Sequence, residues 1–340
     1  MKTFFGMVRK KTAKAAPWVL LAPFVFLLAP FSASGKTLEG VKSLWPDLLL
    51  CEQDRNALAY ETHEKIKWEY KIDGPVLDVQ PQPSGDWLVT GGKGKVFLLH
   101  PTLGKRPLVS SWDWSALATD PPVSAVAADW DLDGKPTLVL AADPVKSRIF
   151  LAEAKSDQPK IRWEFSLPLP PQSVRICPDS GNFLVTLRPS SGKAGPQDAL
   201  VEEVYFQEDK VIWSLSPAEG LTDAWDAVRS PDSRTFVADG SGQIFCFDAD
   251  KNKLWETALT PAGTNQWKNI SVSLFENKRE QILVLVSASG QTKSGRKSLI
   301  YVLNSQDGQI LSESDSLGTN VLPALTRAVP QIQGMELIKK

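Results

Sequence analysis

The stretch VRSPDSRTFVADGSGQIFCFDADKNKLWET, residues 228–257, contains three short apolar segments separated by two tight turns. The first turn is Ser230–Ser233 and the second is Asp248–Asn252; Pro, Asp, Ser and Asn are residues that favour turns. Trp255 closes the unit. Because each apolar segment is only four to six residues long, the stretch predicts short β-strands rather than helices.

Approximate copies of this unit recur along the chain, and tryptophans mark the repeat. Trp68, Trp163, Trp213 and Trp255 occupy the same place in a local pattern, and together with Trp114 they recur at intervals of 42 to 50 residues. Several short strands in each unit of about 40 to 50 residues are typical of a β-propeller. The tryptophans are interpreted as packing residues on the last strand of each unit.

We therefore predict an all-β fold, a single β-propeller of six four-stranded blades spanning residues 36–340. Counting first strands gives five clear units and a weaker sixth near Asn320–Leu325. The last blade would be closed by both ends of the chain, which removes exposed sheet edges. Five or seven blades remain open, because the unit after Leu311 is degenerate. Two Gly-, Ser- and Lys-rich insertions, residues 188–199 and 287–297, are predicted to be mobile surface loops.

Composition limits the functional classes. The net charge of −1 argues against a nucleic-acid partner, which would leave a basic excess. Only two histidines are present, His63 and His100, so a histidine-rich metal site or a histidine-dependent catalytic network is excluded by counting. The three cysteines are not spaced as a metal or redox motif, and we interpret them as small buried residues, although a link from Cys51 to either of the others stays open.

The N-terminus has the layout of a secretory signal peptide. A basic segment that includes Lys2 and Arg9 precedes an apolar run from Ala15 to Phe31, and small residues follow at Ser32–Gly35. We predict that residues 1–35 are removed and that the mature chain is periplasmic or secreted. An uncleaved membrane anchor is the alternative.

Two motifs resemble known repeat families. The run from Gly242 to Glu256 resembles the repeat of quinoprotein-like (PQQ-like) β-propellers, and the turn at Ser230 resembles WD40-like repeats. The resemblance implies the propeller architecture alone, because this superfamily hosts dehydrogenases, assembly scaffolds and sensors. The quinoprotein alcohol dehydrogenases carry adjacent cysteines and a larger ring, so bound PQQ is not expected here.

One motif has the chemistry of a metal site. Asp129, Asp131 and Asp133 form a D-x-D-x-D-G sequence with Gly134, and alternating carboxylates before a glycine can wrap a calcium ion. The surrounding sequence resembles an FG-GAP/VCBS repeat, in which this loop joins the first two strands of a blade. Thr137 stands where such loops place a further carboxylate, which should weaken binding. An acidic turn with solvated side chains is the alternative.

Further candidate residues are expected at the mouth of the propeller or near its channel, because they lie in or just before first strands. They are Asp78, Arg175, Asp223, Trp225, Asp226 and Trp267. The two tryptophans could form an aromatic platform for a peptide or sugar, and packing between blades is the alternative.

These features lead to two hypotheses. The first is an exported, non-catalytic propeller that binds a protein or polymer through its mouth or rim loops. The second is a quinoprotein-like oxidoreductase or another channel-site enzyme, with Asp78, Asp223 and Asp226 as its acids. Aspartates within reach of one another in the channel would favour the enzyme. An apolar channel with tryptophan exposed on the rim would favour the scaffold.

Overall fold

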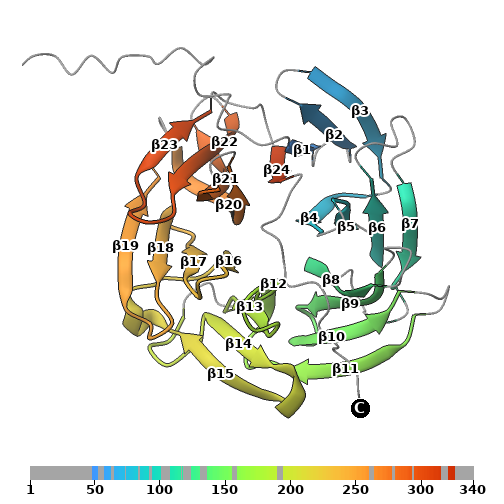
Figure 1. The fold of residues 1–340 in the computed structure, drawn as a ribbon, viewed down its shortest axis with the longest axis horizontal. Helices are drawn as coiled ribbons and strands as arrows, with labels where there is room; N and C mark the ends of the chain where they lie inside the picture. The colour runs from blue at the N-terminus through green and yellow to red at the C-terminus, as the bar shows by residue number, and fades with distance from the viewer. Residues whose placement is uncertain are drawn as a thin grey trace, which may run out of the picture.

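The computed structural model is a single all-β propeller (Figure 1). It describes residues 48–325 except 53–56, 63–64, 73, 83–84, 92–93, 101–107, 116, 118–123, 131–135, 155–158, 190–193, 260–263, 278–279, 293–294 and 315–320. The signal-peptide prediction therefore lies outside the described residues.

Five blades each consist of four consecutive antiparallel strands, ordered from the channel outwards. Blade I contains β4 (Val76–Pro81), β5 (Trp87–Gly91), β6 (Lys95–Leu99) and β7 (Leu108–Asp113). Blade II contains β8 (Ser124–Trp130), β9 (Pro136–Asp143), β10 (Arg148–Glu153) and β11 (Ile161–Ser166). Blade III contains β12 (Pro171–Ile176), β13 (Phe183–Leu187), β14 (Val201–Tyr205) and β15 (Lys210–Leu215). Blade IV contains β16 (Asp226–Arg229), β17 (Thr235–Ala238), β18 (Gln243–Phe247) and β19 (Lys253–Ala258). Blade V contains β20 (Thr264–Glu276), β21 (Ile282–Thr292), β22 (Gly295–Asn304) and β23 (Ile310–Glu313).

Five blades are thus described as complete, continuous units, one fewer than the six that the sequence predicts. The difference lies at the ends of the chain. There β1 (Leu48–Glu52), β2 (Ala57–Thr62) and β3 (Lys65–Lys71) form a further four-stranded sheet with β24 (Val321–Leu325). This terminal sheet is not a continuous unit, because its innermost strand comes from the other end of the chain and pairs antiparallel with β1.

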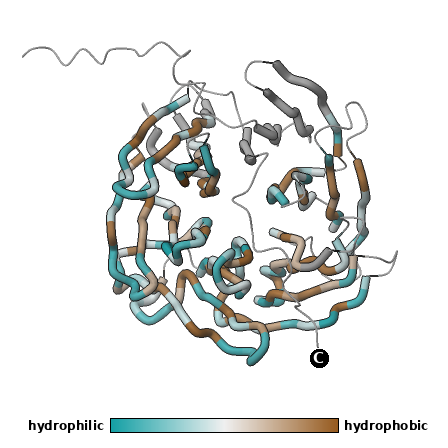
Figure 2. The backbone as a smooth tube through the Cα atoms, viewed as in Figure 1, coloured by the Kyte–Doolittle hydropathy of each residue, from teal (hydrophilic) through white to brown (hydrophobic). Residues whose placement is uncertain are grey.

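The core lies between neighbouring blades. The second and third strands of blade I are almost entirely buried, as are those of blade II, whereas outer strands such as β11 alternate between half-buried and exposed residues. Figure 2 shows the same gradient, with hydrophilic segments along much of the outer wall. Two-sided burial explains why the middle strands are continuous apolar runs.

Every outermost strand carries a β-bulge at the same place. The extra residue is Lys67 in β3, and Val109, Arg162, Ile212, Leu254 and Leu311 in blades I to V. The four apolar members of this series are 37% to 49% exposed. A bulge bends an edge strand and leaves one residue without a ladder partner, so it hinders the pairing of a second chain.

The residue after each bulge explains the tryptophan period. In blades II, III and IV it is Trp163, Trp213 and Trp255, and each indole Nε1 donates to the next blade's turn between its third and fourth strands. The acceptors are Asp209 Oδ1 at 2.6 Å, the Ala249 carbonyl at 3.0 Å and the Ser305 carbonyl at 3.2 Å. In blade I the equivalent residue is Ser110, so Trp114 does not belong to the series and instead packs between blades I and II.

One predicted loop is a regular hairpin. The insertion at residues 287–297 is predicted to be a mobile surface loop, but β21 continues to Thr292 and β22 begins at Gly295. Its polar residues still form a ladder, because backbone hydrogen bonding does not depend on apolar side chains. Blade V therefore extends further than the others at the edge where the second and third strands are joined.

Candidate functional site: the channel and its two mouths

The centre of the channel is occupied by an ion-pair cluster on the inner strands. Arg175 projects from β12, and its guanidinium lies 2.8 Å from Asp226 Oδ2 on β16 and 3.4 Å from Asp78 Oδ2 on β4. The side chains of all three residues are at most 17% exposed. The ring brings together residues that are about 50 or more positions apart in the sequence.

Two further blades join this cluster through hydrogen bonds. The Ser124 hydroxyl on β8 donates to Asp78 Oδ2 at 2.5 Å, and the Val272 amide on β20 donates to Asp226 Oδ2 at 3.0 Å. Gln80 Nε2 also donates to Asp78, at 2.6 Å. The five inner strands of blades I to V thus meet in one polar network.

Arg175 and Asp226 are buried and paired with each other, and both burial and pairing shift their pKa values. Burial acts to lower the pKa of Arg175, but the charges of Asp226 and Asp78 outweigh it and raise the pKa above the usual arginine range. Burial raises the pKa of Asp226, and the positive charge of Arg175 opposes that rise. The two carboxylates share one guanidinium and thereby crosslink the blades. Their oxygen atoms already accept hydrogen bonds within the cluster.

The two faces of the propeller differ in which connections they carry. We call the face at which inner strands begin the upper face; it also carries the turns between second and third strands. The lower face is where the inner strands end. Asp223, Trp225 and Trp267 lie at the upper face: the first two just precede β16, and Trp267 is the fourth residue of β20. Of the six predicted mouth residues, these three remain at the rim, and Asp78, Arg175 and Asp226 meet inside the channel.

Asp223 and Trp225 form a rigid unit with the turn between β17 and β18. Asp223 accepts hydrogen bonds from the Gly240 amide at 2.5 Å and from Trp225 Nε1 at 2.9 Å. The guanidinium of Arg188, from the connection between β13 and β14 of blade III, stacks 4.4 Å from the centre of the Trp225 ring. One face of the indole is therefore covered by a cation, so Trp225 is not an open platform for a sugar ring.

Trp267 packs against the same turn from blade V. A Cβ atom added at Gly242 would lie 2.0 Å from Trp267 Nε1, so only glycine fits beneath this indole. Gly242 also has a φ of +90°, which L-residues rarely adopt. Trp267 is thus a packing residue between blades IV and V that stays half-exposed at the rim.

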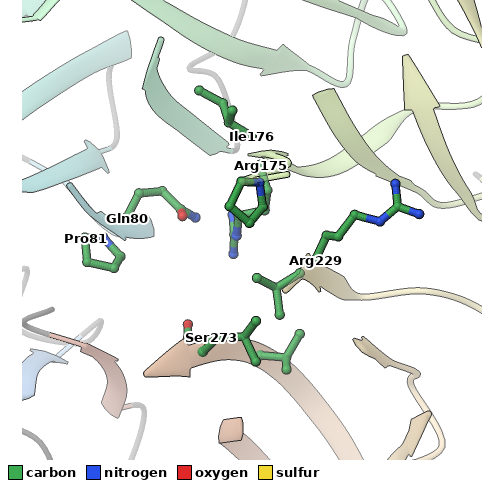
Figure 3. Close-up of a pocket in the computed structure, with 10 residues that line it drawn as sticks. Gln80, Pro81, Arg175, Ile176, Arg229 and Ser273 are labelled. Carbon is green, nitrogen blue, oxygen red and sulfur yellow. The ribbon is translucent and has the colours of Figure 1, made fainter. Parts of the chain in front are cut away.

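The lower mouth of the channel forms a small pocket (Figure 3). Its wall comes from the last residues of four inner strands, including Pro81, Ile176, Val228 and Leu274, and Arg175 lies at its inner end. Arg229 also lines the pocket, but its guanidinium points away and pairs with Glu203. The pocket is therefore mostly apolar, with the ion-pair cluster beyond it.

The predicted calcium loop cannot be placed. Asp129 belongs to β8, but its side chain and the whole of Asp131 and Asp133 lie outside the described residues. Among the residues that the structure does describe, no group of three or more His, Cys, Asp or Glu side chains could hold a metal ion. Calcium binding at this loop stays a prediction.

Two other points concern the described part of the chain. Cys177 and Cys246 are buried thiols that are not in disulfide bonds, and burial raises the pKa of Cys246 to about 12. The helices described here include none that is long and apolar enough to cross a membrane.

Sequence reasoning missed Ser124, Gln80 and Arg188. Ser124 and Gln80 sit on inner strands without any motif around them, and Arg188 begins an insertion that we interpreted as a mobile loop. Nothing in the sequence paired Arg188 with Trp225.

Comparison with known proteins supports the fold alone. No family model matches the chain, and no curated protein matches its sequence. Among solved structures, BBS1N in complex with ARL6DN is similar with a TM-score of 0.51 and 10% identity, over 80% of this chain and 77% of that one. The WD40 domain of Toxoplasma gondii coronin has a TM-score of 0.48 and 9% identity, over 73% of this chain and 61% of that one. Kuenenia stuttgartiensis hydrazine synthase has a TM-score of 0.47 and 10% identity, over 69% and 64%.

Proposed function

We propose that this protein is an exported, non-catalytic β-propeller that binds a protein or polymer partner through its upper face. The observation that carries the proposal is the stacking of Arg188 on Trp225 at that face. Arg and Trp are enriched among the residues that dominate binding energy at protein interfaces. Of the two partner classes, a protein is favoured, since the covered indole does not suit a sugar.

Arg188 is well placed to contact a partner. Its side chain is half-exposed, and no carboxylate among the described residues pairs with it. Stacking on the indole fixes the guanidinium plane and leaves its N–H edge for an acceptor, such as a carboxylate or a main-chain carbonyl of the partner. Because Trp225 is itself held by Asp223, little conformational entropy is lost on binding.

The hairpin of β21 and β22 supports the same choice of face. Its two strands are 11 and 10 residues long, and their connection lies on the upper side. We propose that it forms a wall beside the Arg188–Trp225 pair. Rim loops and hairpins on a rigid scaffold are common binding elements.

We further propose that the terminal sheet acts as a sixth blade and closes the ring. Two observations support this: β24 lies against β4 of blade I and β20 to β22 of blade V, and β3 carries the same bulge as the five other outer strands. A closed ring would give the partner a rigid surface. Export by the signal peptide at residues 1–35, to the periplasm or the outside, is part of the proposal; a membrane anchor is its alternative.

One observation in the channel favours the alternative hypothesis, that the protein is an enzyme. Asp78 and Asp226 do converge, as a quinoprotein-like oxidoreductase or other channel-site enzyme would require. Both carboxylates, however, are tied to Arg175 and to further donors on neighbouring blades. An acid or base held this way would have to break a buried crosslink to move a proton, so a binding function is the better explanation.

The test compares two charge reversals in the full chain. Arg188→Glu removes the upper-face cation, whereas Arg162→Glu, at an exposed position on the outer wall, is the control. We expect polypeptides crosslinked to the wild-type protein in its host's envelope to be lost with Arg188→Glu and kept with Arg162→Glu. The proposal is wrong if both variants retain the same polypeptides, or if the wild type captures none.

A further inference from the structure

The upper face carries two cationic side chains that are not paired with a carboxylate of the described residues. Arg188 stacks on Trp225, and its guanidinium forms no ion pair within the described part of the chain. Lys146, in the turn between β9 and β10, is exposed, and its Nζ atom lies 3.5 Å from the Leu117 carbonyl. A guanidinium has five donors and an ammonium group has three, so both side chains keep donors for another molecule.

The carboxylates in the turns around Arg188 and Trp225 are held by the protein itself. Each accepts a hydrogen bond from a nearby backbone amide, at 2.5 to 2.9 Å; they are Asp198, Asp223 and Asp239. This part of the face therefore offers hydrogen-bond donors without partners, whereas its carboxylate acceptors already have donors.

Trp267 supplies a further donor beside the same turn. A Cβ atom added at Gly240 would lie 2.3 Å from Trp225 Nε1. One added at Gly242, two residues on, would lie 2.0 Å from Trp267 Nε1, so the two indoles border one turn. Trp225 Nε1 already donates to a carboxylate, whereas Trp267 is half-exposed and its Nε1 has no acceptor among the described residues. Arg188 and Trp267 thus present N–H groups at one site.

We propose that the partner bound at the upper face is an acidic polypeptide segment, with a carboxylate that pairs with Arg188. The inference rests on the proposed function and adds the chemistry of its partner. A planar guanidinium can donate two parallel hydrogen bonds to one carboxylate, and stacking on the indole holds it in one plane. A carbonyl of the same segment accepts from Trp267 Nε1, and a second carboxylate pairs with Lys146 on blade II.

Two observations favour a polypeptide over an acidic polysaccharide or a nucleic acid. Arg188 covers one face of Trp225, so an arginine and not a sugar or a base stacks on this indole. The net charge of the chain is −1, whereas nucleic-acid binding usually requires a basic excess. A polypeptide supplies both groups that the site needs, an isolated carboxylate and main-chain carbonyls.

The experiment measures binding of the full chain to fluorescently labelled poly-L-glutamate, with polygalacturonate as a second probe. We expect the wild type to bind poly-L-glutamate, and Arg188→Gln to weaken binding about tenfold, because one charge-assisted pair is lost. Arg162→Gln removes the same charge from the outer wall, where the Arg162 side chain is 59% exposed, and should leave binding unchanged.

Three results would overturn the proposal. The first is that poly-L-glutamate does not bind. The second is equal binding by the two variants, because the attraction would then be a general effect of charge. The third is tighter, Arg188-dependent binding of polygalacturonate, since the partner would then be an acidic polysaccharide.

A matched pair of substitutions tests the contact at Trp267. Trp267→Phe keeps an aromatic ring but removes the N–H donor, and it is expected to weaken poly-L-glutamate binding about fivefold. Trp163→Phe is the control, because it removes an indole donor that bonds to Asp209 on the outer wall. Equal effects of the two substitutions would contradict a contact between Trp267 and the segment.

The result can be separated from that of the proposed function. If Arg188→Glu loses the crosslinked host polypeptides but the wild type does not bind poly-L-glutamate, the upper-face function stands and its partner is not acidic. If poly-L-glutamate binds through Arg188 but no host polypeptide is crosslinked, the acidic-segment site stands and the proposed function is wrong.

Discussion

Arg175 lies at the centre of a network that joins the inner strands of five blades, and it contacts Asp78, Ser124 and Asp226 directly. A buried carboxylate paired with a guanidinium contributes mainly through the cost of breaking the pair. In this propeller Asp226 contacts Arg175 and also accepts from the Val272 amide of the next blade. Loss of its charge should therefore be felt across blades III, IV and V.

Asp226→Asn is predicted to lower the free energy of unfolding by about 3 kcal/mol, because one partner of a buried ion pair is neutralised. Asp223→Asn, at the rim, should cost about 1 kcal/mol, as it weakens only hydrogen bonds. Urea denaturation of both variants measures the difference. Equal effects would show that the cluster is not a special crosslink.

The contribution of Glu202 to the stability of the fold is predicted to depend on pH. It is 5% exposed, its Oε2 atom has no hydrogen-bond partner, and burial raises the pKa of its carboxyl above the ordinary glutamate value. A raised folded-state pKa means that stability is greatest below the unfolded pKa and is lost as pH rises through the folded pKa.

Glu202→Gln is therefore predicted to be more stable than the wild type at pH 8, with the gap closing towards pH 4. Thermal melts across this range measure it, and Glu208→Gln, at an exposed position, is the control. A gap that is constant with pH would show that the charge of Glu202 does not destabilise the fold.

At the scale of elements, the repeat predicted strands where the structure has them, since the stretch 228–257 contains β17, β18 and all but the last residue of β19, and the weak unit near Asn320–Leu325 contains β24. The bulges were not predicted, because a bulge is a property of the register between two strands. This is why Trp114 was grouped with the repeat although Ser110 occupies the equivalent position. The hairpin at 287–297 was missed because its composition is that of a loop.

Two glycines in turns at the ends of strands allow the cost of backbone strain to be measured apart from the cost of lost packing. Gly242 and Gly85 both have positive φ, +90° and +86°, but only at Gly242 does a tryptophan lie where a Cβ would be. Gly85→Ala is predicted to cost about 1 kcal/mol for its backbone alone. Gly242→Ala should cost about 2 kcal/mol more, because Trp267 must move away.

The measurement combines chemical denaturation with the fluorescence of the folded state. A changed emission spectrum in Gly242→Ala but not in Gly85→Ala is expected, since only the former displaces an indole. If both substitutions cost the same and leave the spectrum unchanged, Trp267 does not depend on Gly242 for its position.

At the scale of the whole molecule, the sequence predicted the propeller, because the repeat can be counted, whereas closure of a sixth blade by both chain ends stays a proposal. The candidate site was predictable only in part. Asp78, Arg175 and Asp226 were candidates individually, but their convergence depends on how the ring brings distant inner strands together. Arg188 lay in a segment without periodicity, so no sequence signal connected it to Trp225.

The ring closure can be tested through a native cysteine. Cys51 on β1 lies directly opposite Leu322 on β24, so Leu322→Cys is predicted to form a disulfide under mild oxidation. The bond should raise the free energy of unfolding by about 3 kcal/mol, because it closes a long loop. Val321→Cys, at the neighbouring position, pairs in register with Glu52 and not with Cys51, and it should crosslink poorly. Equal crosslinking of both variants would contradict this register.

The central claim is that the ion-pair cluster in the channel is structural and that the molecule acts by binding a partner. Native mass spectrometry of the protein purified from its host's envelope tests this most directly. The account predicts the mass of the processed chain, with or without calcium, together with a co-purifying polypeptide. A small-molecule adduct that survives desolvation, such as a bound quinone, would contradict it.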